Sequence, residues 1–140
     1  MFVLIAGGGR TGARLANLLI NQNYKVRLIE DRRELLTHLH QELPTEVIYE
    51  GNPVDPSVLE AAGLRDAHAI AAVTSADATN LVLCHLAKTM FYVPRTIARV
   101  NNPNNAWLFN EKFQVDVALN SADVLAHLIQ EEMSLGDMMT

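Results

Sequence analysis

The sequence predicts an α/β fold, in which a doubly wound parallel sheet of about six strands lies between two layers of helices (α/β/α). Three observations lead to this prediction. Short apolar runs of strand length alternate with longer patterns of helical period, and the links between them are short. Parallel strands need crossover connections, so this alternation favours a parallel sheet that is covered on both faces. A glycine-rich segment follows the first apolar run and marks a special turn.

The first elements are the clearest. Phe2–Ala6 is apolar throughout and is predicted to be a strand. Arg10–Asn21 is predicted to be a helix, because its apolar residues return every three or four positions. Lys25–Glu30 is the next strand, and Arg32–Leu43 is a helix that ends before Pro44, since proline lacks the N–H that a helix needs.

The middle of the chain continues the alternation. We expect a short strand at Glu46–Tyr49 and a short helix at Pro56–Ala62, which Gly63 ends. Ala69–Val73 has the composition of a buried strand. Ala76–Met90 has the strongest helical pattern in the chain.

Two strands and two helices complete the predicted order. The strands are Thr96–Val100 and Val115–Leu119, and the helix between them covers Asn102–Lys112 with Pro103 at its first position. A last helix is expected at Ser121–Met133. We therefore expect one domain over residues 1–133 and a frayed tail over residues 134–140.

Composition limits the function. The net charge of −5 argues against nucleic acid as a main partner. Cys84 is the single cysteine, which rules out an intramolecular disulfide and favours a cytosolic setting. The apolar run at the start is too short for a signal peptide or a membrane span, so we expect any work at a membrane to go through a partner.

Gly7, Gly9 and Gly12 form the pattern G-x-G-x-x-G between a predicted strand and a predicted helix. Glu30 follows 18 residues after Gly12, at the end of the second strand. This is the dinucleotide-binding arrangement: glycines allow a diphosphate to approach the backbone, and an acid accepts hydrogen bonds from a ribose. Glu30 would repel a 2′-phosphate, which disfavours NADP. Arg32 and Arg33 follow at once, and we interpret them as solvated residues of a first helical turn.

Two longer blocks carry a resemblance to a known family. The segment GNPVDPSVLEAAGLRDAHAIAAVTSADATN, from Gly51, resembles the pattern G-D-x-T-x-x-x-x-L-x-x-A-G-I-x-x-A-D…T-x-x-D-x-x-N of RCK domains, also called KTN or TrkA-N domains. TIARVNNPNNAWLF resembles the I-A-R-x-x-N-P-x-N-A of the same family. The resemblance covers about Phe2 to Ile129 and implies a Rossmann-like fold.

The resemblance implies a cofactor-binding site. The glycines and Arg10 would meet phosphates, Glu30 the adenosine ribose, and Gly51 with Asn52 the adenine. Asn52 stands where the family pattern has aspartate, and its amide can both donate and accept. The whole expected set is Gly7, Gly9, Arg10, Thr11, Gly12, Glu30, Asp31, Gly51, Asn52, Thr74, Asp77, Asn80 and Arg99.

The resemblance also implies a function. RCK domains regulate potassium channels and Trk/Ktr-type potassium transporters, so we expect a cytosolic regulatory lobe, peripheral to the membrane, that binds NAD(H) or ATP/ADP. Full RCK proteins carry a second lobe that the resemblance does not find here. A homodimer or larger ring is expected through the apolar helix Asp77–Phe91 and the Trp107 region, with Leu83 and Met90 among the contacts. The alternatives are a small NAD-dependent oxidoreductase and a nucleotide-sensing adaptor of another membrane carrier.

Neither metal binding nor catalysis is expected from the remaining residues. The five histidines and Cys84 lack the spacing of a metal site. We interpret His85 as a core or interface residue and His127 as partly buried. Thr74, Ser75 and Asp77 could hold a nucleophile and a base, but a loop before a helix favours the same residue types as caps.

Overall fold

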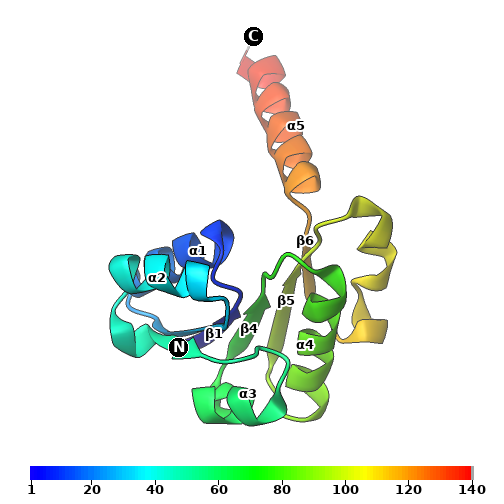
Figure 1. Cartoon of the computed structure of the whole chain (residues 1–140). Coiled ribbons are helices and arrows are strands. Elements are labelled where there is room, and N and C mark those ends of the chain that lie inside the picture. The colour runs from blue at the N-terminus through cyan, green and yellow to red at the C-terminus, as the bar shows by residue number, and fades with distance from the viewer. Residues whose placement is uncertain (140) are drawn as a thin grey trace.

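The structure is a computed structural model that describes residues 1–139. A parallel sheet of six strands forms its centre, in the order β3-β2-β1-β4-β5-β6 (Figure 1). The strands are β1 (Phe2–Ala6), β2 (Lys25–Glu30), β3 (Ile48–Glu50), β4 (Ala69–Ala72), β5 (Arg95–Arg99) and β6 (Val117–Leu119). The five α-helices are α1 (Arg10–Asn21), α2 (Arg33–Glu42), α3 (Pro56–Ala62), α4 (Asp77–Thr89) and α5 (Ser121–Met139).

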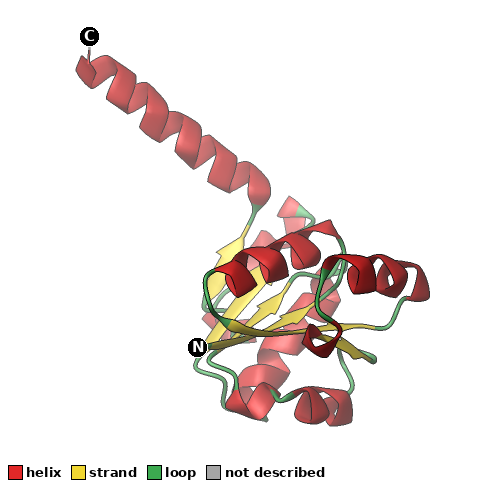
Figure 2. Ribbon diagram, turned by 90° about the vertical axis from the view of Figure 1, so that its left-hand side faces the viewer, coloured by secondary structure: helices red, strands yellow, loops and turns green. Residues whose placement is uncertain are grey.

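Two apolar cores lie on the two faces of the sheet. The pleat of β1 places Leu4 in one core and its neighbour Ile5 in the other. Helices α3 and α4 cover the first face, and α1 and α2 cover the second (Figures 1 and 2). The three-layer α/β/α architecture is therefore confirmed.

Most local signals act as expected. Gly63 ends α3 in the left-handed conformation, with φ of +95°. The strand expected at Glu46–Tyr49 begins later, because a 3₁₀-helix, η1 (Thr45–Val47), follows Pro44. A second 3₁₀-helix, η2 (Leu64–Asp66), connects α3 to the turn before β4.

The prediction of one helix over Asn102–Lys112 is wrong. Two 3₁₀-helices, η3 (Pro103–Leu108) and η4 (Glu111–Phe113), replace it. The side chains of Asn102 and Asn110 each accept a hydrogen bond at 3.0 Å from the backbone N–H two positions further on. The Asn102 bond caps the start of η3, as it would cap a longer helix, whereas Asn110 caps a second helix start inside the expected helix and so divides it.

The residues expected to form the interface of α4 are only partly exposed. Leu83 is fully buried and Phe91 is 2% exposed, so both belong to the core of their own subunit and correct the expected contact set. Val82 and Met90 are the large apolar residues of this segment that face solvent, and Trp107 on η3 is 72% exposed. His85 is exposed rather than in the core.

Helix α5 projects away from the sheet (Figures 1 and 2). It continues past the expected end at Met133 to Met139, so the segment expected to be frayed is helical as far as it is described. No proline interrupts this segment, and an exposed apolar Leu135 continues the earlier pattern. His127, expected to be partly buried, is exposed and pairs with Glu131 at 3.0 Å. Among residues 1–139, no helix combines the length and apolarity needed to cross a bilayer.

Candidate functional site

A cleft opens at the carboxyl ends of the strands, beside the point between β1 and β4 where the strand order reverses. In open parallel sheets, ligands bind at this switch point. The cleft encloses about 260 Å³. Its walls come from the turns after four strands and from the start of α4: Gly7, Glu30, Asp31, Arg32, Asn52, Pro53, Val54, Thr74, Ser75, Ala76 and Thr79.

The three glycines after β1 serve different purposes. Gly7 has φ of +115°, and a Cβ there would lie 3.0 Å from the backbone nitrogen of Thr74. A Cβ at Gly12 would lie 1.7 Å from the carbonyl oxygen of Gly7, so only glycine lets the first turn of α1 pack this closely on the turn after β1. A Cβ at Gly9 would meet no atom within 4 Å. Gly9 therefore borders open space, where a ligand can approach.

The first turn of α1 is open to an anion. Its N-cap residue, Gly9, provides no side-chain cap. The first N–H groups of the helix therefore have no partner within it, and they lie at the positive end of its dipole. Arg99 at the end of β5 donates from Nη1 to the Thr11 hydroxyl at 3.3 Å, which brings a cation to this helix start.

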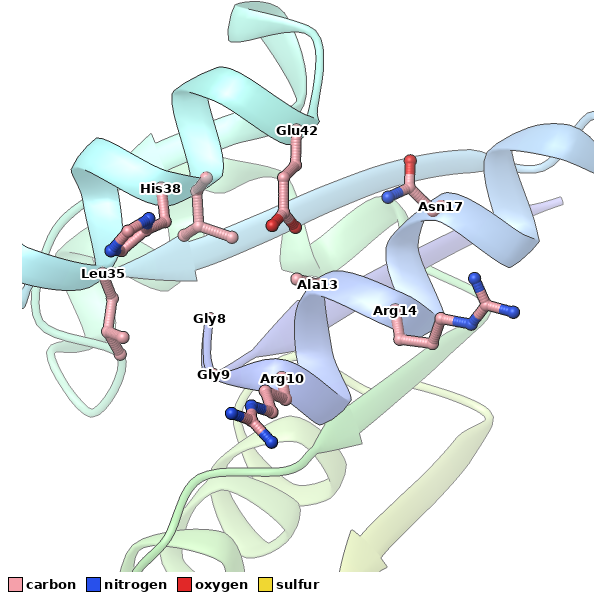
Figure 3. A pocket seen from close by; sticks show the side chains of 10 residues that line it. Gly8, Gly9, Arg10, Ala13, Arg14, Asn17, Leu35, His38 and Glu42 are labelled. Carbon is pink, nitrogen blue, oxygen red and sulfur yellow. The ribbon is translucent and has the colours of Figure 1, made fainter.

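Arg10, expected to meet phosphates of its own or a facing subunit, follows Gly9 at the start of α1. It lines a separate groove of about 500 Å³ between α1 and α2 (Figure 3). Arg14, His38 and Glu42 line the same groove, and all four of these charged or polar side chains are exposed. Gly9 and Arg10 are the only expected site residues in this groove, so the cleft at the strand ends is the better candidate.

Glu30 is the buried acid of the cleft, with a side chain that is 3% exposed. Its Oε1 accepts hydrogen bonds from the Gly8 N–H at 2.8 Å and from Arg32 Nη2 at 3.0 Å. Its Oε2 accepts from the N–H groups of Asp31 and Arg32, both at 3.0 Å, and from Arg32 Nε at 3.1 Å. Burial alone would raise the pKa of this carboxyl, but the hydrogen bonds from Arg32, Gly8 and Asp31 outweigh burial and lower the pKa to about 2.

The position of Arg32 differs from the interpretation that it is a solvated residue of a first helical turn. Arg32 is the N-cap residue of α2 and not a residue of the first turn, and its guanidinium is paired with Glu30 although the side chain remains 44% exposed. Arg33 is exposed, as expected of a solvated residue. Asp31, expected among the cofactor-binding residues, is exposed and lines the cleft. The pairing of residues two positions apart is not visible in a sequence pattern, because it depends on the turn after β2.

Asn80 holds the two strand ends that border the cleft. It is fully buried, and its Oδ1 accepts from the Thr74 N–H at 3.0 Å and from the Thr74 hydroxyl at 2.7 Å. Its Nδ2 donates to the carbonyl oxygens of Thr74 at 3.1 Å and Arg99 at 3.0 Å. All of its hydrogen-bonding capacity is therefore used within the protein. Asn80 therefore supports Thr74 and Arg99, and its expected contact with a ligand stays a prediction.

Asp77 forms a second support. Its carboxylate accepts from the N–H groups of Asn101 at 2.7 Å and Asn102 at 2.9 Å, and from the amide groups of Asn101 and Asn105 at 3.1 and 2.9 Å. Desolvation alone would raise the pKa of Asp77, but these hydrogen bonds lower it. Asp77 thus anchors the loop after β5 to the start of α4, and it is committed to this contact rather than free for a ligand.

The expected adenine end of the cleft is built by a turn. The Oδ1 of Asn52 accepts from the Val54 N–H at 3.1 Å, so the turn itself uses the carboxamide oxygen. Aspartate, the residue in the family pattern, has the same acceptor. Gly51 donates its N–H to the Glu30 carbonyl oxygen at 3.1 Å, and a Cβ on it would lie 2.7 Å from Val58. Gly51 therefore supports the cleft and is absent from its lining.

The histidines and Cys84 have structural surroundings. His68 accepts the Phe2 N–H on Nδ1 at 3.0 Å, and His40 pairs with Glu50 at 2.9 Å. Burial raises the pKa of the Cys84 thiol to about 12. Within residues 1–139, no three His, Cys, Asp or Glu side chains gather as metal ligands.

Comparisons with known proteins agree with the family resemblance found in the sequence. The family model for the TrkA-N domain matches residues 3–121. The Trk system potassium uptake protein TrkA of Mycobacterium tuberculosis is 38% identical over 139 residues, which cover 99% of this chain and 62% of that protein. The chain therefore spans about three fifths of the length of this relative.

Solved structures share the fold. GsuK bound to ADP has a TM-score of 0.74 at 24% identity over 92% of this chain and 32% of GsuK. The GsuK channel bound to NAD has a TM-score of 0.73 at 24% identity over 95% of this chain and 24% of the channel. The TrkA-N domain of the inner membrane protein ybaL of Escherichia coli has a TM-score of 0.76 at 19% identity, over 93% and 94% of the two chains.

The lowered pKa of Glu30 predicts a loss of stability in acid. The carboxyl has an ordinary pKa of 4.5 when unfolded and a pKa of about 2 when folded. Its contribution is therefore present above pH 4.5 and is lost as the pH falls toward 2. At about 1.4 kcal/mol per pH unit, the contribution is about 3 kcal/mol. Denaturant unfolding at several pH values should show a smaller acid loss in Glu30→Gln than in wild type.

Glu60→Gln is the matched control for this measurement, because Glu60 is an exposed acid paired with Arg65 at 3.2 Å. Its unfolding free energy should fall with acid as that of wild type does. Parallel acid curves for wild type and Glu30→Gln would contradict the prediction.

Proposed function

Because the chain belongs to the TrkA-N domain family, we propose that it is a nucleotide-binding regulatory lobe of a potassium channel or potassium transporter. The observation that carries the proposal is the cleft at the switch point, where a buried carboxylate, a glycine turn and an open helix start lie together. The relative named as a potassium uptake protein supports the transport role. In this proposal, the lobe lies at the cytoplasmic face of the membrane through a membrane partner.

The proposed ligand is an adenine nucleotide, either NAD(H) or ATP/ADP. The helix start and Arg99 favour phosphates, and Glu30 favours ribose hydroxyls. GsuK, which shares the fold, has been solved with both ADP and NAD. Binding would shift the balance between two subunit arrangements. A tenfold difference in affinity between the two arrangements supplies about 1.4 kcal/mol per site.

Regulation fits the site better than catalysis does. Hydride transfer would need an acid or base near the ligand, and the sequence offers the segment after β4, with Thr74 and Asp77, for that role. The side-chain oxygens of Thr74, Asp77 and Asn80 are already used in internal hydrogen bonds. We therefore do not favour the oxidoreductase alternative. The same cleft would also serve an adaptor of another membrane carrier. The fold is shared with the TrkA-N domain of the inner membrane protein ybaL, so the experiments below also test this alternative.

We also propose that the chain pairs with a second copy of itself through α5 and the neighbouring edge of the sheet. Within residues 121–136, the large apolar residues of α5 are exposed: Val124, Leu125, Leu128, Ile129, Met133 and Leu135. A groove of about 320 Å³ lies at the base of α5 and is lined by residues of η3, β6 and α5 itself. Trp107 lies on the same η3 segment, and Val117 and Leu119 expose apolar surface on edge strand β6. An apolar surface of this extent is typical of an interface.

Glu30 predicts the choice of nucleotide. NAD(H), ADP or ATP should bind at least about tenfold tighter than NADPH, because a 2′-phosphate would bring negative charge to a buried carboxylate. Calorimetric titration of the purified chain measures this ratio, and the same samples should show no steady oxidation of NADH with aldehydes or oxo acids. Tighter binding of NADPH would show that Arg32 and Arg33 dominate the site.

Gly9→Ala should remove nucleotide binding and leave the fold intact, because the added methyl enters space that the protein leaves open. Cells that carry this variant in place of wild type should lose nucleotide-dependent control of potassium uptake at an equal protein level. Ala78→Gly, on exposed α4 surface, is a control that should change neither binding nor uptake. Unchanged uptake in Gly9→Ala cells, together with lost binding in vitro, would favour the adaptor of another carrier.

Self-association should depend on the apolar side of α5. Wild type should sediment as a dimer or larger species at about tens of micromolar, the range of a weak dimer. Leu128→Glu should shift it to monomers, because a buried carboxylate there would lack a partner and each large side chain contributes about 1.5–3 kcal/mol when buried. Gln130→Glu adds the same charge to α5 at a polar position and should leave the dimer intact. A monomeric wild type would overturn this interface.

A further inference from the structure

The Glu30 carboxylate has no free acceptor position for a ribose. A carboxylate offers about four lone-pair sites to donors. Glu30 already accepts five hydrogen bonds, three from backbone N–H groups and two from the Arg32 guanidinium, at 2.8 to 3.1 Å. A ribose hydroxyl can therefore donate to this carboxylate only after one of the present donors leaves.

The guanidinium is the donor that can leave. The other three donors are backbone groups of Gly8, Asp31 and Arg32, and moving them would unfold the turns after β1 and β2. The carboxylate itself is held in place by these three backbone donors, two on Oε2 and one on Oε1. The Arg32 side chain, in contrast, is 44% exposed and lies in the wall of the cleft.

We propose that Arg32 is a latch over the ribose position of the site, and that an adenine nucleotide binds only after its ribose displaces the guanidinium from Glu30. This proposal rests on the proposed function and adds a specificity-determining residue to it. Arg32 also neutralises Glu30 in the latched arrangement, which offsets the cost of burying this charge. Its fork-shaped contact, with Nε on one oxygen and Nη2 on the other, matches the two donors of a 2′,3′-diol.

The latch lowers the apparent affinity for the nucleotide. When a site is competent for only a fraction of the time, the measured dissociation constant rises by the inverse of that fraction. An ion pair with one exposed partner has moderate strength, so the competent fraction is about one tenth to one fifth. Removal of the guanidinium should therefore tighten binding by about fivefold to tenfold.

Calorimetric titration with ADP tests the latch on wild type, Arg32→Ala and Arg33→Ala. Arg33 is exposed and adjacent, so Arg33→Ala removes the same charge from the same helix start without touching Glu30. Arg32→Ala should bind ADP about fivefold to tenfold more tightly than wild type. Arg33→Ala should bind with equal or weaker affinity. Arg32→Met keeps an unbranched stem of similar length and should also bind more tightly, which provides the measurement if Arg32→Ala folds poorly.

The outcomes separate the latch from the proposed function. If wild type binds ADP and the Arg32 variants bind equally or more weakly, the latch is overturned and nucleotide binding stands. If wild type binds neither ADP nor NAD, the proposed function fails, and the latch fails with it. Tighter binding by Arg33→Ala to the same degree would show a general charge effect and would also overturn the latch.

Discussion

The buried carboxylate of Glu30 is the contact on which the geometry of the cleft depends. It lies at the end of β2 and accepts the N–H of Gly8 in the turn after β1, so one side chain ties together two neighbouring strand ends. It also accepts the N–H groups of Asp31 and Arg32, where α2 begins. A charge that is 3% exposed is stable only because five donors surround it. The glycines make this possible, since a side chain at position 8 would collide with Glu30 and Leu39.

Polar residues on the other side of the cleft have a similar purpose. Asn80 links the ends of β4 and β5, and Asp77 ties the asparagine-rich loop after β5 to α4. Both stand at positions where the family resemblance implies ligand contacts, and the side chains of both form their hydrogen bonds within the protein. A rigid cleft results, in which the shape of the site is fixed by buried amides and carboxylates. The groups left for a ligand are mainly backbone N–H groups, because the Glu30 carboxylate already accepts five hydrogen bonds.

The far edge of the sheet differs from the cleft, because its apolar side chains are exposed and have few partners. Helix α5 carries a broad apolar side with no covering element among the described residues, and β6 and Trp107 extend that surface. A regulatory lobe needs both properties. A preorganised site binds a ligand with little reorganisation of the protein. An apolar surface allows contacts between subunits, and the binding free energy can then favour one arrangement of those contacts over another.

Sequence by itself determined the order of strands and helices, the parallel sheet, the glycine turn with its acid and the end of α3 at Gly63. These features depend on local conformation and on hydrophobic period, which neighbouring residues set. Tertiary structure alone decided which side of α4 is buried, so that Leu83 and Phe91 lie in the core while Met90 does not. It also decided that Asn80 and Asp77 support the cleft, and that Arg32 covers Glu30. The reason is that these contacts join segments far apart in the chain or depend on the exact path of a turn, as when Asn80 meets Arg99 across two strand ends. A sequence pattern shows which residues can form hydrogen bonds, and only the folded chain shows which bonds they form.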